Sequence, residues 1–377
     1  MIICVGKTRI AILTLKRYFL KYPNRRALII VPSIPLHKQW TSLLEKNSLT
    51  NGCTVRVINT ALKYSWDQEF LIIDEVHRMA ATEFRKIFSL VNYKQILCLT
   101  ATIKRLDGLD FIIEHYAPVC DEVPLNVCLA NNWVSPYREY KVLIKTDLTE
   151  YRAIHTEFVK HFSFFNYDFD LAMRCVKSIS QQNLLAKQLG VHIKQVKAST
   201  YSFVRLMKLR KQWVLEHPEK IKITEQILNA RKDKKILTFS SSIDMVKKLQ
   251  GGFVVHSKIS PKKVQKIISD FIACDSGALH SVDSLRDGID ITGVSVGVLL
   301  GYNRSTLKKI QTIGRVIRKE GQNKSAEVFT LVIQDTIEED WFRKSSKDKT
   351  YTTIDANDLD IVLNNSYVEQ KDVIYFS

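Results

Sequence analysis

The sequence lacks several features that would assign it to common protein classes. No apolar run approaches the length of a membrane span, and Lys7 and Arg9 come too early for a secretory signal. The seven cysteines are scattered without a CxxC pair, which argues against a disulfide framework or a zinc site. No low-complexity linker is visible. We therefore expect a protein of a reducing cytoplasm with no membrane partner.

Acidic residues are absent from one long stretch of the chain. Residues 171–215 contain nine Lys or Arg and no Asp or Glu, within a chain of net charge +17. A balance this basic indicates a polyanionic partner, although solubility alone could explain part of it. With 377 residues, 45% of them hydrophobic, the chain is long and apolar enough for two packed domains.

Short apolar runs alternate with amphipathic segments in both halves of the chain. The runs at 27–31, 70–73 and 96–99 lie in the first half, and those at 236–239, 253–255, 296–300 and 328–333 lie in the second. This rhythm predicts an α/β fold with two lobes, each built on a parallel sheet covered on both faces. Residues 149–220 lack strand rhythm and are predicted to be mostly helical, ending near Pro218.

A phosphate-binding turn is suggested near the start of the chain. Gly6, Lys7 and Thr8 lead directly into the amphipathic run 9–18. Glycine lets the backbone wrap a phosphate, lysine reaches the β and γ phosphates, and the hydroxyl can ligate Mg²⁺. The full pattern also requires a glycine five places before Gly6, where Met1 stands. By itself the triplet is a weak signal.

Carboxylates follow the second apolar run. Asp74 and Glu75 come directly after residues 70–73, the kind of strand end where open α/β sheets place their sites. Asp74 is predicted to hold Mg²⁺, and Glu75 to orient and deprotonate an attacking water. A solvated acidic turn is the alternative. Thr100 and Thr102 follow the next strand, where they could equally belong to an ordinary turn.

Polar groups in the second half could complete a divided nucleotide site. Gly288 and Asp290 precede a buried strand and are predicted to contact the nucleotide. Gln311, Arg315 and Arg318 share one helix face at i, i+4 and i+7. An ordinary basic amphipathic helix explains that face equally well. If Lys7 and Asp74 hold ATP opposite, however, the two guanidinium groups can reach its γ-phosphate.

In order and spacing, these motifs resemble those of the superfamily-2 helicases and translocases. The matching segments are residues 6–8 (motif I), 31–33 (Ia), 74–77 (a DExH-type motif II), 100–102 (III), 238–240 (IV), 287–290 (V) and 311–318 (VI). The surroundings of motif III, residues 99–108, look like those of DNA-directed members. These members include phage recombination helicases of the UvsW type and type III restriction translocases.

The resemblance implies two RecA-like lobes with ATP and Mg²⁺ between them and a nucleic-acid strand across both. It assigns Gly6, Lys7, Thr8, Gly288 and Asp290 to the nucleotide, and Thr8 and Asp74 to the metal. The catalytic roles fall to Glu75, Gln311, Arg315 and Arg318, and the coupling of the lobes to Thr100 and Thr102. Motif I lacks its first half, so we expect a fragment, a start placed downstream of the true one, or a degenerate loop.

Two sets of residues are candidates for nucleic-acid contact. Thr60 matches a backbone-contacting threonine of the family's first lobe. Lys194, Lys197, Arg205 and Lys208 belong to the basic stretch, where aromatic residues are interleaved. Basic side chains neutralise phosphates and aromatic rings stack on unpaired bases. A solvated basic helix face is the alternative, and a helix-turn-helix remnant near Gln195 receives little weight.

The leading hypothesis is an ATP-dependent DNA helicase or translocase of phage or viral type, acting in the host cytoplasm. Its substrate would be single-stranded or branched DNA, with RNA left open, and replication, recombination or restriction partners are unidentified. The alternatives are a truncated, non-catalytic nucleic-acid-binding remnant and the motor subunit of a restriction complex. The expected divisions are a first lobe at 1–130, a junction with the basic segment at 131–220, a second lobe at 221–345 and a tail at 346–377.

Overall fold

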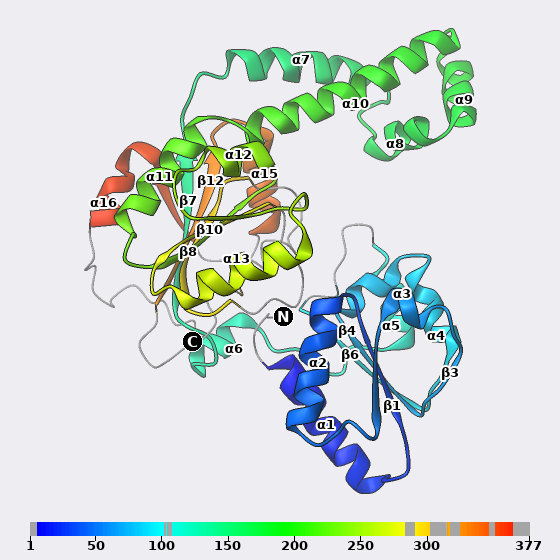
Figure 1. Cartoon of the computed structure of the whole chain (residues 1–377). Coiled ribbons are helices and arrows are strands. Elements are labelled where there is room, and N and C mark those ends of the chain that lie inside the picture. The colour runs from blue at the N-terminus through cyan, green and yellow to red at the C-terminus, as the bar shows by residue number, and fades with distance from the viewer. Residues whose placement is uncertain are drawn as a thin grey trace.

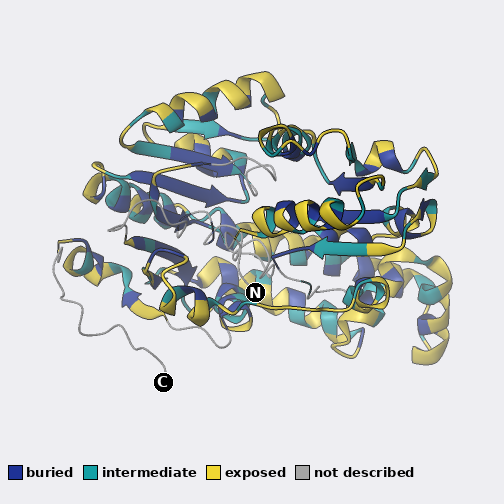
Figure 2. Ribbon diagram, turned by 90° about the horizontal axis from the view of Figure 1, so that it is seen from below, coloured by how far each residue is buried: buried dark blue, intermediate teal, exposed yellow. Residues whose placement is uncertain are grey.

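The chain forms two α/β lobes, and a long helical arm extends from the second (Figure 1). The computed structural model describes residues 6–101, 103, 108–282, 291–301, 314, 316, 325–346 and 351–364. Among these residues, no helix is long and apolar enough to cross a membrane. The strands form the buried interior of each lobe, and the helices present one exposed face each (Figure 2).

The sheet of the first lobe has four parallel strands in the order β2–β1–β4–β6. Their bounds are β1 Ala27–Val31, β2 Cys53–Val57, β4 Phe70–Asp74 and β6 Gln95–Leu99. Every residue of the two central strands, β1 and β4, is buried, since both of their faces are covered. The edge strands β2 and β6 are only partly buried. A separate two-stranded ribbon pairs β3 (Trp66–Asp67) with β5 (Val91–Asn92).

Helices cover both faces of this sheet because alternate strand residues point to opposite sides. On one face α1 (Lys7–Lys21) and α2 (Ile34–Lys46) pack on Ile29, Val31 and Ile72. The other face is covered by α3 (Ile58–Ala61), α4 (Ile87–Leu90), α5 (Asp110–Tyr116) and the 3₁₀ turn Val76–Ala80, with a second 3₁₀ turn at Phe84–Lys86.

The sheet of the second lobe has seven parallel strands in the order β13–β7–β12–β11–β8–β10–β9. Their bounds are β7 Tyr137–Ile144, β8 Lys235–Ser240, β9 Phe253–Val255, β10 Gly277–Val282, β11 Val294–Leu299, β12 Ala326–Ile333 and β13 Thr352–Asp355. Two parallel sheets with covering helices confirm the predicted α/β class with two tandem lobes.

Helices again lie on both faces of this second sheet. The helices α6 (Leu125–Ala130) and α13 (Pro261–Ala273) contribute to one core. The other core includes residues of α11 (Glu219–Ala230), α12 (Ile243–Lys248) and α16 (Leu359–Asn364), which follows the 3₁₀ turn Ala356–Asp358. The helix α15 (Ile337–Ser345) follows β12 and packs against it.

The second lobe extends beyond the limits expected from the sequence. β7 lies in the segment expected to be a junction, and β13 lies in the expected tail, yet the two strands pair with each other. Cys128 of α6, from the expected first lobe, is buried in a second-lobe core. β13 contains only four residues, and β7 mixes charged with apolar ones, so neither gives the apolar run on which the prediction relied.

The helical arm comprises α7 (Thr149–Ser163), α8 (Phe169–Lys177), α9 (Ile179–Leu189) and α10 (Ile193–Leu215). It leaves the second lobe after β7 and returns to it at α11 (Figure 1). The arm has its own core, which includes Phe158, Phe165 and Phe203. The far end of α10 instead buries Val214 and Leu215 in a core of the lobe, so one continuous helix of about 35 Å joins the two cores.

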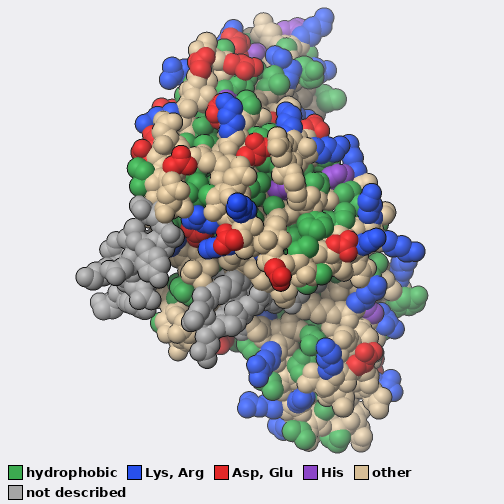
Figure 3. All heavy atoms as spheres, turned by 60° about the vertical axis from the view of Figure 1, so that its left-hand side comes forward, with side chains coloured by type: hydrophobic (Ala, Val, Ile, Leu, Met, Phe, Trp, Pro, Cys, Tyr) green, Lys and Arg blue, Asp and Glu red, His purple; other side chains and the backbone are tan. Residues whose placement is uncertain are grey.

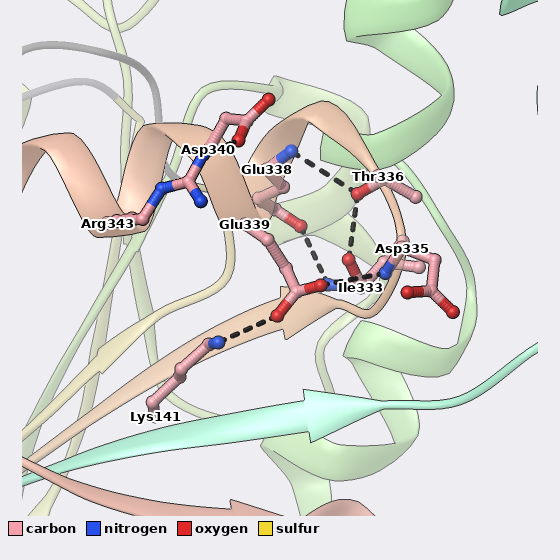
Figure 4. Close-up of polar contacts among 8 residues, drawn as sticks. All are labelled: Lys141, Ile333, Asp335, Thr336, Glu338, Glu339, Asp340 and Arg343. Carbon is pink, nitrogen blue, oxygen red and sulfur yellow. Dashed lines mark hydrogen bonds and ion pairs between the residues drawn. The ribbon is translucent and has the colours of Figure 1, made fainter.

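A buried ion pair fastens the base of the arm. Lys220, in the first turn of α11, donates to both carboxylate oxygens of Glu338 on α15, at 2.6 and 2.7 Å, and both side chains are 0% exposed. Glu338 Oε2 also accepts the Ile333 backbone N–H at 3.0 Å. Figure 4 shows this end of β12, where Glu339 accepts from Lys141 and from the Asp335 N–H.

Candidate functional site

The helix α1 begins where the phosphate-binding turn was predicted. Gly6 caps it with φ 77° and ψ 25°, a left-handed conformation that a β-carbon would strain. Lys7 is the first helical residue, and Lys7 and Thr8 are both partly exposed. The first amide groups of a helix have no intrahelical acceptors, and they attract anions. Gly6, Lys7 and Thr8 thus lie where a phosphate group would be favoured.

Asp74 ends β4 as a buried carboxylate held by two donors. The Trp40 indole N–H, from α2, donates to Asp74 Oδ2 at 2.9 Å, and the Glu75 backbone N–H donates to Oδ1 at 3.0 Å. Both bonds fix the direction of the carboxylate. Each oxygen keeps a second lone pair for another partner.

Glu75 follows in a strained backbone conformation. Its φ of 52° lies in the left-handed region, where a non-glycine residue is uncommon. This turn accompanies the break between β4 and the 3₁₀ turn Val76–Ala80. Such strain persists only where the surroundings impose it, and it is concentrated at functional sites.

Four side chains form a polar chain across the carboxyl ends of the strands. Lys7 Nζ lies 3.2 Å from Glu75 Oε1, and His77 Nδ1 lies 3.3 Å from Glu75 Oε2. His77 Nδ1 is also 3.0 Å from the hydroxyl of Thr100, which follows β6. The start of α1 is thereby connected to the ends of β4 and β6, although these segments lie far apart in the sequence.

The pKa values of the two neighbouring carboxyl groups are shifted in opposite directions. Burial raises the pKa of Asp74, and the nearby Glu75 charge adds to that effect against the Trp40 hydrogen bond. Burial also raises the pKa of Glu75, but the His77 hydrogen bond and the Lys7 charge outweigh it and lower that pKa to about 2. Environments that push two acids apart commonly mark distinct chemical roles. Glu75 therefore stays ionised at neutral pH, whereas the ionised form of Asp74 would be stabilised by a nearby cation.

The residues present fit a magnesium nucleotide. Mg²⁺ usually takes only one or two protein carboxylates and completes its shell with water and phosphate oxygens. Asp74 is a buried carboxylate whose raised pKa shows that burial is incompletely compensated. No cluster of three or more His, Cys, Asp or Glu that could hold a metal occurs among the described residues. An ion held mainly by Asp74, Thr8 and substrate phosphates fits this donor set.

The structure brings together only part of the predicted site. Lys7, Glu75 and Thr100 join one polar network, with Asp74, Gly6 and Thr8 as chain neighbours. The remaining candidates for nucleotide binding, catalysis and coupling lie outside the described residues: Thr102, Gly288, Asp290, Gln311, Arg315 and Arg318. Within that last motif Val316 is described, and it is buried in the core of the second lobe. A β-carbon at Gly297 of β11 would lie only 2.8 Å from its side chain.

The nucleic-acid candidates all lie on the surface. Thr60 is exposed on α3, which follows β2 directly. Lys194, Lys197, Arg205 and Lys208 are exposed along α10. On the face drawn in Figure 3, Lys and Arg side chains lie across both lobes with Asp and Glu among them. Net charge alone therefore does not single out a binding surface.

Trp40 is a site residue that sequence reasoning missed. It is completely buried, and its indole N–H reaches Asp74 from a helix 34 positions earlier in the chain. A lone tryptophan in an amphipathic helix is ordinarily a core residue, and Trp40 is one as well. Only the packing of α2 against β4 reveals its second role.

Two segments match known protein families. Residues 58–105 match the model described as type III restriction enzyme, res subunit. Residues 219–320 match the model described as helicase conserved C-terminal domain. The two matches fall on different lobes, in the order expected from the motifs.

A viral protein is similar to part of this chain. Part of the chain is 34% identical over 138 residues to QP509L of African swine fever virus, provisionally named an ATP-dependent RNA helicase. That alignment covers 30% of this chain and 26% of the relative. The chain therefore matches only about a quarter of the length of this viral relative.

Three solved structures have a similar fold. Dbp5 of S. cerevisiae, bound to RNA and ADP BeF3, aligns with TM-score 0.56 and 13% identity over 90% of this chain and 80% of its own. The type ISP restriction-modification enzyme LlaBIII, bound to DNA, aligns with TM-score 0.59 and 11% identity over 96% of this chain and 30% of its own. The Hef helicase domain of Pyrococcus furiosus aligns with TM-score 0.50 and 14% identity over 91% of this chain and 93% of its own.

Proposed function

We propose that this chain, which belongs to the superfamily-2 helicases of the restriction-enzyme type, hydrolyses ATP to move along or remodel DNA. The family acts on nucleic acid with ATP, and the choice of DNA is our own proposal. It is supported by the restriction-enzyme match at 58–105 and by the resemblance of residues 99–108 to the motif III surroundings of DNA-directed members. The RNA helicase names among the relatives make RNA the competing substrate, so both must be assayed.

One observation carries the proposal: the contact between Lys7 and Glu75 beside the buried Asp74. The Lys7 ammonium group rests 3.2 Å from the carboxylate that we propose as general base. An arriving phosphate offers Lys7 a competing anionic partner at the start of α1. We infer that Lys7 transfers from Glu75 to the phosphate. This transfer leaves the carboxylate ready to orient and deprotonate a water.

The other residues have supporting roles in this proposal. Asp74 and Thr8 would hold Mg²⁺, which supplies charge neutralisation on the phosphate oxygens when bound. His77 contacts both Glu75 and Thr100, so a change at Glu75 would alter the contacts at the end of β6. We propose Thr100 and Thr102 as the link from the nucleotide to the DNA-contacting surface.

The second lobe would complete the site. Gly288 and Asp290 are proposed to contact the nucleotide, and Gln311, Arg315 and Arg318 to bind the γ-phosphate when the lobes close. Arginine suits this role because its charge is permanent and its planar fork matches phosphate oxygens. Fingers of this kind can raise turnover by about 10³ to 10⁵. Thr60 and the basic face of α10 are proposed to contact the nucleic acid.

The test compares ATP hydrolysis by the wild type, Lys7→Ala and Glu75→Gln, with single-stranded DNA, forked DNA or RNA added. We expect Glu75→Gln to lower turnover by about 10² to 10⁴ while ATP still binds, because only the base is lost. Lys7→Ala should abolish turnover and spare DNA binding. Lys16→Ala is the matched control, because Lys16 is exposed on the same helix.

Two outcomes would count against the proposed ATP site, and a third would count against DNA as the substrate. Full ATP turnover by Lys7→Ala would remove Lys7 from the phosphate site. A wild-type chain that binds DNA but never hydrolyses ATP would support the non-catalytic remnant instead. Stimulation by RNA and not by DNA would keep the enzyme and replace its substrate.

A further inference from the structure

The helices α9 and α10 are joined by a tight three-residue turn, 190–192. Gly190 ends α9 with φ 64°, a left-handed position that suits glycine. The Val191 N–H donates to the Ala186 carbonyl at 3.0 Å, and the Gly190 N–H to that of Lys187 at 3.3 Å. This pair of bonds is a Schellman motif, which ends a helix and redirects the chain. In Figure 1, α9 runs across the outer end of α10.

The next helix begins in a fixed orientation. The His192 ring accepts the Lys194 N–H at 3.2 Å and so caps α10. Leu185 and Ala186 of α9 share the arm core with Val196 and Phe203 of α10. The inner faces of both helices are thereby buried against each other. The first turns of α10 must therefore present their opposite face to solvent.

That opposite face carries a regular basic stripe. Lys194, Lys197, Tyr201, Arg205 and Lys208 follow one another at intervals of three and four residues and share one side of the helix. All five are exposed, Tyr201 at 72%. Because residues 171–215 contain no acidic side chain, no carboxylate of this segment competes for the stripe. The second half of the stripe, from Tyr201 to Lys208, spans about two helical turns.

The geometry favours duplex DNA as the occupant. Two helices joined by a short glycine-containing turn, the second with a free face, form the arrangement that places a recognition helix in the major groove. The major groove of B-form DNA admits an α-helix, whereas the deep, narrow major groove of RNA does not admit side chains. A single-strand platform instead offers several stacking aromatics, and Tyr201 is the only aromatic among the five residues of the stripe.

We propose that α9, the turn and α10 form a helix-turn-helix that reads duplex DNA. Lys194, Gln195 and Lys197, in the first turns of α10, contact base edges, while Arg205 and Lys208 contact phosphates farther along. Lys187 of α9 is exposed and approaches the DNA backbone. The proposal deepens the proposed function, since it names the form of nucleic acid that the arm takes. DNA binding by the arm requires no ATP, because α10 is exposed without closure of the lobes.

The test measures fluorescence anisotropy of the full chain without ATP. The probes are random-sequence duplex DNA of about 20 base pairs, roughly two helical turns, its single strand and the matching duplex RNA. Lys194→Glu with Lys197→Glu should weaken binding of duplex DNA by about 10-fold or more and change binding of the other two probes much less, because those probes can still bind the lobes. Lys232→Glu is the control, because Lys232 is exposed on the second lobe, after α11.

Base reading is tested by selecting preferred duplexes from a random pool. On the selected duplex, Gln195→Ala should weaken binding by about 5- to 100-fold and relax the preferred sequence. Lys208→Ala should instead weaken all duplexes alike and lower the salt dependence by about one ion. The same probes are measured with Lys7→Ala, which should bind duplex DNA normally even if the ATPase assignment is wrong.

Three results would overturn the helix-turn-helix. They are an equal loss of duplex-DNA, single-strand and duplex-RNA binding in the Lys194/Lys197 double variant, unchanged duplex-DNA binding in that variant, and no sequence enriched by selection. Circular dichroism of each variant shows whether the arm remains helical. The substituted residues of α10 and Lys232 are all exposed, so we expect unchanged spectra for these variants.

Discussion

Two Lys–Glu pairs near the carboxyl ends of strands, Lys220–Glu338 and Lys7–Glu75, differ in how far they are closed to solvent. Lys220 and Glu338 are 0% exposed, and Lys220 reaches both carboxylate oxygens. Lys7 and Glu75 are 22% and 18% exposed and make one contact of 3.2 Å. The first pair has no access for a competing anion, whereas the second lies at an open helix start. A closed pair holds a structure together, and an open pair can exchange a partner for a ligand.

Their surroundings reinforce this difference. Glu338 accepts a backbone N–H from the end of β12, so the carboxylate also completes the turn into α15. Glu75 instead contacts His77, which leads to Thr100 after the neighbouring strand. One carboxylate is saturated by the fold. The other belongs to a chain of groups that a bound phosphate would rearrange.

The largest expected effect is the loss of the closed pair. Lys220→Met should lower the free energy of unfolding by about 3–5 kcal/mol, because Glu338 would remain buried without its counter-charge. Lys7→Met should lower it by only about 0–1 kcal/mol, since a partly exposed pair contributes little. Urea unfolding followed by circular dichroism measures both values. Adding Glu338→Gln to Lys220→Met should recover most of the loss, because no unpaired charge remains.

Comparable losses from the two lysine variants would break the comparison. The Lys7–Glu75 contact would then be a structural pair like the other one. An unaffected Lys220→Met variant would mean that water or another group solvates Glu338.

Acid should act on the open pair with an intermediate effect. The pKa of Glu75 falls from an ordinary 4.5 to about 2 on folding. Its contribution to stability is therefore full above pH 4.5 and is lost as the pH falls from 4.5 through 2. Glu75→Gln should remove up to about 3 kcal/mol of that acid-dependent loss. The measurement is the free energy of unfolding at several pH values across this range.

Glu45→Gln supplies the matched control for the acid experiment, since Glu45 is exposed on α2. A wild type and a Glu75→Gln variant with parallel pH curves would contradict the lowered pKa. Asp74 acts in the opposite sense: because folding raises its pKa above the ordinary 3.8, its contribution to stability is lost as the pH rises above that value.

A loss of stability smaller than that of Lys220→Met is expected at Trp40. Trp40→Phe removes the hydrogen bond to Asp74 and should cost about 1–3 kcal/mol. The same bond lowers the pKa of Asp74, so its loss should move the acid limb of Mg²⁺-dependent ATP hydrolysis to higher pH. A pH profile of turnover at fixed Mg²⁺ tests this positioning role.

Trp66→Phe separates positioning from stability. Trp66 also donates its indole N–H, but to the Ala61 carbonyl in the same lobe. The Trp66→Phe variant should lose less stability, because Trp66 is only partly buried, and should not move the pH profile. An identical shift in both variants would show that Trp40 acts only through packing.

Much of the fold followed from local sequence, because buried parallel strands are continuous apolar runs. β1 and β9 lie where their runs predicted, and β4, β6, β8, β11 and β12 differ by one or two residues at their ends. β2 and β10 were missed. β2 is an edge strand that contains Arg56, and β10 buries His280, which bonds to Thr238 and Gly251 instead of contributing to an apolar run.

The sequence by itself determined the alternation of strands and helices, the position of the Gly6–Lys7 turn and the placement of Asp74 at a strand end. Periodicity and glycine preference are local properties, so they can be read along the chain. Only the tertiary structure decided that Lys7 meets Glu75, that Trp40 holds Asp74, and that β7 and β13 belong to the second sheet. These contacts join distant segments, and burial sets both their strength and the pKa of each carboxyl group.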